Sequence, residues 1–114
     1  HSTSNLDLTA KIDPDLVIGI VPMAYDPAKP PRGASLVVRR FAQSRLAREV
    51  SQVQAKGANV LLLRPSADDL RAMGPNMMRR EGNDIVARVA YDSAARQLDT
   101  DRSRELLAAR LAAV

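Results

Sequence analysis

The strongest constraint on the fold is a pair of continuous apolar runs joined by a helical pattern. The first run covers residues 16–22 and the second covers residues 59–65. Neither run alternates with polar residues, which is typical of parallel strands covered by helices. Parallel strands need a crossover connection, and the helical periodicity between the two runs supplies it. The sequence therefore predicts an α/β fold with a parallel β-α-β unit over residues 16–65.

The chain offers too few strands to finish such a sheet. A sheet of two strands leaves edges and faces that need cover. With 114 residues there is room for one domain or for part of a larger one. Residues 1–15 are predicted to be a connecting segment with one helical turn, and residues 66–114 to be helical. The unit is therefore expected to be one flank of a larger sheet.

The predicted crossover helix begins with Ser35 as its N-cap and ends before Gly57, which suits a left-handed C-cap. Its apolar stripe has steps of three and four residues. The stripe consists of Val38, Phe41, Ala42, Leu46, Val50 and Val53. The arginines of this helix fall mostly off the stripe, and two interpretations stay open. They form either a solvated helix face or a basic face for anionic lipid headgroups.

Three further helices are predicted after the second strand. Ser66 and Asp69 have the spacing of a capping box, and Gly74 ends the short helix that they begin. Asp68 and Asp69 are therefore interpreted as helix-capping residues and not as catalytic or metal-binding carboxylates. Asn83 is the predicted N-cap of a helix running to about Leu98. The apolar side of that helix consists of Ile85, Val86, Val89, Ala90 and Ala94, and the last helix presents Leu106, Leu107 and Leu111.

The composition excludes several classes of chemistry. The chain has no cysteine and one histidine, so a transition-metal site is not expected. Neither strand is followed by a glycine-rich phosphate loop, and no Gly-x-Ser-x-Gly nucleophile elbow is present. No cofactor is therefore predicted. Aromatic residues make up 3% of the chain, and the net charge is +4. The arginines are scattered over the predicted helices with acidic residues between them, so no nucleic-acid partner is expected.

Three segments together resemble the C-terminal part of bacterial patatin-like phospholipases. They are the strand at residues 16–23, the strand and proline at residues 60–66, and the turn at residues 70–78 with its Ala-Met-Gly-x-Asn-x-Met pattern. The opening Ser-Thr-Ser-Asn-Leu-Asp-Leu at residues 2–8 is similar to the segment that follows the family's Asp-Gly-Gly motif. The resemblance covers nearly the whole chain. It implies a larger three-layer patatin-like sandwich, to which these residues contribute the C-terminal segment.

The resemblance further implies a lipid acyl hydrolase with a Ser–Asp dyad and a glycine-rich oxyanion loop. None of these residues is carried over, since they are expected upstream of His1. Asp7, Asp13 and Asp15 do not match the Asp-Gly-Gly setting, so the 114 residues alone are expected to be inactive. The implied partners are the N-terminal half of the same domain, a lipid or acyl-ester substrate and a membrane surface.

Within this interpretation the substrate-binding residues are predicted at the carboxyl ends of the strands, where open α/β sheets bind ligands. Flexible apolar side chains follow both strands at this edge and suit an acyl chain, although ordinary packing under a loop would use methionine equally. The predicted set is Met23, Tyr25, Met73, Met77 and Met78. The alternative function is a non-enzymatic α/β module whose Arg-rich helix surface binds an anionic partner or membrane.

Overall fold

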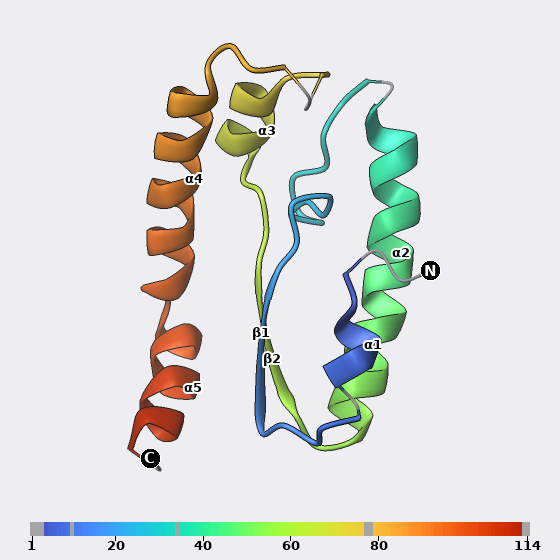
Figure 1. The fold of residues 1–114 in the computed structure, drawn as a ribbon, viewed down its shortest axis with the longest axis vertical. Helices are drawn as coiled ribbons and strands as arrows, with labels where there is room; N and C mark the ends of the chain where they lie inside the picture. The colour runs from blue at the N-terminus through green and yellow to red at the C-terminus, as the bar shows by residue number, and fades with distance from the viewer. Residues whose placement is uncertain (1–3, 10, 34, 77–78, 113–114) are drawn as a thin grey trace.

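The computed structural model describes residues 4–9, 11–33, 35–76 and 79–112. Strands β1 (Leu16–Ile20) and β2 (Asn59–Leu63) pair in parallel, with Leu16 opposite Asn59 and Ile20 opposite Leu63. Helix α2 (Ser35–Ala55) makes the crossover between them (Figure 1). The predicted α/β class and parallel β-α-β unit are therefore confirmed. β1 ends at Ile20, earlier than predicted, because Val21 donates a last hydrogen bond to Leu63 and Pro22 has no N–H.

One face of the strand pair packs against α2 and the single turn of α1 (Leu6–Thr9), as Figure 1 shows. The core on this side is aliphatic, as the composition predicts. It consists of Leu6, Val17, Val21, Ala24, Leu46, Val53, Ala58 and Val60. Val17 in β1 and Val21 just after it lie four residues apart in extended backbone, so both side chains reach this core on the same side. The predicted helical turn within residues 1–15 is confirmed by α1.

The buried face of α2 differs from the predicted apolar stripe. It runs through Arg39, Ala42, Leu46, Glu49 and Val53, at alternating steps of three and four residues. The predicted stripe members Val38 and Phe41 are exposed instead. The helix is rotated because the loop after β1 presents carbonyl groups that need donors. Gly57 has a φ of +93° just after the helix, which confirms the predicted left-handed residue there. The predicted cap by the Ser35 side chain lies outside what the structure describes.

Helices α4 (Asn83–Leu98) and α5 (Asp101–Leu111) lie on the other side of the strands, and α3 (Ala67–Met73) packs against α4 (Figure 1). The Ser66 hydroxyl accepts from the Asp69 N–H while the Asp69 carboxylate accepts from the Ser66 N–H, which confirms the predicted capping box. Asn83 was predicted to be the N-cap of α4, and this prediction is wrong, because Asn83 is the first residue of the helix. Gly82, with a φ of +79°, is the N-cap because its backbone makes the sharp entry that a side chain would strain.

Two of the predicted apolar contacts on this side are not made. Ile85 and Leu111 are exposed, since the helices turn smaller side chains toward the sheet. Ile18 and Ile20, on the β1 face opposite the core, are 49% and 78% exposed. The prediction that both strands are covered on both faces is therefore wrong for β1.

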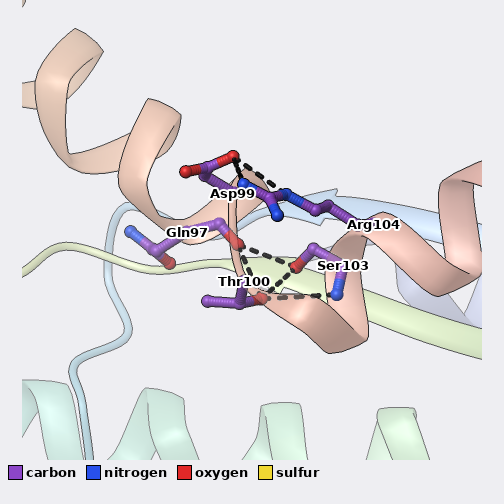
Figure 2. Close-up of polar contacts among 5 residues, drawn as sticks. All are labelled: Gln97, Asp99, Thr100, Ser103 and Arg104. Carbon is purple, nitrogen blue, oxygen red and sulfur yellow. Dashed lines mark hydrogen bonds and ion pairs between the residues drawn. The ribbon is translucent and has the colours of Figure 1, made fainter.

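A polar junction fixes the angle between α4 and α5 and attaches α4 to the end of β2. The Ser103 hydroxyl donates to the Gln97 carbonyl oxygen at 2.7 Å, and the Thr100 hydroxyl accepts from the Ser103 N–H as the N-cap of α5 (Figure 2). The Gln97 side chain accepts from the Arg64 N–H at 3.0 Å and donates to the Arg64 carbonyl at 2.8 Å. One amide thus satisfies both backbone groups that follow the strand.

Replacing Gln97 with leucine is expected to lower the free energy of unfolding by about 1–3 kcal/mol, because two part-buried backbone groups lose their partners. Urea denaturation of both proteins measures the change. The matched control is Gln52→Leu on the exposed side of α2, where a change within about 0.5 kcal/mol is expected. Equal effects of the two substitutions would contradict the role assigned to Gln97.

Candidate functional site

The parallel strands end at one edge, and an apolar hollow of about 240 Å³ opens there. We call it the strand-end pocket. Its lining residues are Ile20, Pro22, Leu63, Arg64, Pro65, Asp69, Met73, Ala90, Ser93, Ala94 and Gln97. They come from the last residues of both strands, from α3 and from one face of α4. The pocket therefore occupies the position at which open α/β sheets bind ligands.

Small side chains on α4 create the space for this pocket. Ala90 and Ala94 lie one turn apart, as do Ser93 and Gln97, so all four residues occupy one face of the helix. Gln97 holds this face against the end of β2, while the short side chains above it do not fill the gap. Sequence reasoning missed Ser93 and Gln97. The signal was the run of small or polar residues on the side of α4 that faces the sheet.

Asp69 gives the pocket one polar group that needs a partner. Its side chain is 3% exposed, and its Oδ2 accepts from the Ser66 N–H at 2.6 Å. Within the described part of the chain, its Oδ1 has no hydrogen-bond partner. A buried carboxylate oxygen is costly unless it accepts a hydrogen bond. The pocket thus suits a molecule that is mostly apolar and carries a donor, or an apolar molecule with a water beside Asp69.

The structure separates the predicted substrate-binding residues. Met73 lines the strand-end pocket and an adjoining hollow of about 230 Å³, which shares Pro22 with it. Met23 lies in a small hollow of about 50 Å³ on the α2 side of β1. Tyr25 is buried and its N–H donates to Gln43, so it contributes to neither. Met77 and Met78 lie outside the described residues. The assignment of these residues to substrate stays a prediction.

The N-terminal segment reaches the same edge of the sheet as the strand ends. Ser4 lines the small hollow together with Pro22 and Met23, directly after β1. The Ser4 hydroxyl donates to the buried Glu49 carboxylate of α2, which ties this segment to the crossover helix.

The strand-end pocket holds one serine hydroxyl, that of Ser93. This hydroxyl accepts from the Gln97 side chain at 3.2 Å. Among the described residues, no group of three histidine, cysteine or acidic side chains could hold a metal ion. In the same residues, no helix is long and apolar enough to cross a membrane.

Comparison of the chain with protein-family models, with curated proteins and with solved structures found no match. The interpretation of the pocket therefore depends on its own geometry and chemistry.

Ala94→Leu is expected to raise the free energy of unfolding by about 0.5–2 kcal/mol, because the larger side chain fills empty apolar space. Thermal and urea denaturation measure the change. The neighbouring exposed residue supplies the control, since Ala95→Leu adds the same side chain on the solvent side of α4. If the region were already tightly packed, Ala94→Leu would instead destabilise the protein by about 1–3 kcal/mol. The sign of the change in the free energy of unfolding therefore shows whether the pocket is empty.

Proposed function

We propose that this chain is the C-terminal segment of a patatin-like lipid acyl hydrolase and that the strand-end pocket receives part of the acyl chain. The observation that carries the proposal is an apolar pocket at the carboxyl edge of a parallel β-α-β unit, with Ser4 beside the same edge. Ser4 belongs to the segment that, in the resemblance, follows the family's Asp-Gly-Gly motif. The catalytic aspartate would then enter next to the pocket.

The unfinished sheet supports the same proposal. β1 pairs only with β2 in the described residues, so its other edge is free. Ile18 and Ile20, on the face of β1 opposite the core, are exposed apolar side chains that a further covering layer would bury. In the proposed protein, the N-terminal half of the domain supplies further strands along β1 and the elements that cover both isoleucines.

In the proposed reaction the residues of this chain position the substrate. The upstream serine attacks the ester carbonyl and passes its proton to the aspartate, while backbone amides hold the oxyanion. The aspartate then returns the proton to the leaving oxygen as the ester bond breaks, and the alcohol departs. Water then releases the fatty acid from the serine. The apolar wall around Met73 and Ala94 holds the acyl chain away from water. The binding energy of the acyl chain is thereby used to orient the ester.

The proposal predicts Asp-Gly-Gly a few residues before His1 and Gly-x-Ser-x-Gly further upstream, which sequencing of the complete reading frame tests. The protein that includes this upstream segment is expected to hydrolyse p-nitrophenyl esters, and the 114 residues alone are not. Absence of both motifs, or absence of esterase activity in the complete protein, would sink the proposal.

Chain-length preference tests the role of the pocket separately. In the complete protein, Ala94→Leu is expected to lower kcat/KM for laurate esters by about tenfold while leaving butyrate esters nearly unchanged, because only the longer chain reaches the filled space. Met73→Ala is expected to shift the preference toward longer chains. Ala95→Leu is the control. An unchanged kcat/KM ratio between laurate and butyrate in both pocket variants would remove the pocket from the substrate path.

One observation favours the alternative of a non-enzymatic module. Val37, Val38 and Phe41 are exposed on α2. The guanidinium carbon of Arg45 lies over the Phe41 ring, 5.7 Å from its centroid. Exposed apolar residues among arginines suit an anionic membrane surface. Salt-sensitive binding of the complete protein to anionic vesicles, without any esterase activity, would favour this function over the hydrolase.

A further inference from the structure

A second and larger hollow lies between the proline-rich loop after β1 and helix α3. Its volume is about 660 Å³, and we call it the basic hollow. The lining residues are Lys29, Pro30, Pro31, Arg32, Gly33, Arg39, Ala67, Leu70, Arg71, Gly74 and Pro75. Four of these carry positive charge, and no acidic residue of the described chain is among them. Such a concentration of one charge in a concave site attracts anions.

The four cations differ in how firmly they are held. Lys29 and Arg32 are exposed loop residues, and neither side chain makes an ion pair within the described residues. Arg71 is paired on the surface with Asp68. Arg39 is 5% exposed, and one of its nitrogens donates to the carbonyl oxygens of the loop at 3.1 and 3.3 Å. The site thus combines a fixed, buried guanidinium with two charges that are available for a ligand.

Burial lowers the pKa of the Arg39 guanidinium through desolvation. Arginine starts so far above neutrality that the group stays charged at physiological pH. An anion that enters the hollow interacts strongly with a buried cation in its wall, because the interaction is screened less than on an open surface.

The loop that carries Lys29 and Arg32 is stiffened in advance. The Asp26 side chain accepts from the Ala28 N–H at 3.0 Å, and the Asp26 carbonyl accepts from the Lys29 N–H at 2.9 Å. Pro30 and Pro31 fix the backbone that follows. Little conformational freedom of this backbone is left to lose on binding, which favours affinity.

We propose that the basic hollow binds a phosphate group, with Lys29, Arg32 and Arg39 as its ligands. Guanidinium groups match phosphate oxygens with paired hydrogen bonds, and a lysine adds a point charge. The divalent charge and tetrahedral oxygens of phosphate use three cations better than a single carboxylate would. This proposal does not depend on the acyl hydrolase proposal. Free inorganic phosphate and the phosphomonoester of a lipid headgroup offer the same chemistry.

The experiment measures phosphate binding to the purified chain by isothermal titration calorimetry with inorganic phosphate. A second arm measures co-sedimentation with phosphatidylcholine vesicles that contain phosphatidic acid, compared with phosphatidylcholine alone. The test variant is Lys29→Ala/Arg32→Ala, which changes exposed loop residues. The matched control is Arg40→Ala/Arg48→Ala, which removes the same charge from exposed positions of α2 outside the hollow. Circular dichroism checks that all variants are folded.

The expected result is saturable binding in at least one arm that Lys29→Ala/Arg32→Ala weakens by at least about tenfold and the control by less than about twofold. Arg39→Lys should weaken binding as well, because it keeps the charge and loses the paired donors. Binding in the first arm alone identifies free phosphate as the ligand, and binding in the second alone identifies a lipid headgroup. Absence of binding in both arms, or equal losses in the two double variants, would overturn the proposal.

Discussion

The hydrogen bonds from the Arg39 guanidinium to the carbonyl oxygens of Pro22 and Ala24 hold the loop that leaves the sheet after β1 against α2. Pro22 ends β1 because it has no N–H, and its carbonyl and that of Ala24 would otherwise be without donors. Arg39 supplies both donors from α2. Burying the Arg39 charge has a cost in free energy. An apolar residue at position 39 would remove that cost but would leave both carbonyls without these donors.

Helix α3 divides the space beyond the strand ends into two sites with different chemistry. Asp69 and Met73 face the apolar strand-end pocket, whereas Leu70 and Arg71 line the basic hollow. The capping box at Ser66 sets the rotation of the first turn and so decides which residues face each side. A change in that cap would therefore alter both sites together.

The elements that local chemistry determines were predictable from the sequence. The parallel strands follow from their continuous apolar runs, and the cap at Ser66 follows from the geometry of helix starts. The burial of Arg39 was not predictable, because it depends on carbonyl groups contributed by a distant loop. The carboxyl edge was predicted as the place for a ligand, but the α4 wall of the strand-end pocket was not, since the pocket arises where Ala90 and Ala94 leave space that larger residues would fill. Sequence reasoning placed Met23 and Met73 at one edge, but β1 lies between their hollows.

Ile20 connects the unfinished sheet with the proposed function. It is the last residue of β1, it is among the most exposed apolar side chains described, and it lines both the strand-end pocket and the small hollow beside Ser4. An element paired to the free edge of β1 would cover Ile20 and close the open side of both spaces. Water would then be excluded from the apolar wall, and the interaction of Asp69 Oδ1 with a donor would strengthen. Completion of the sheet and formation of a competent binding site are, in this proposal, the same structural event.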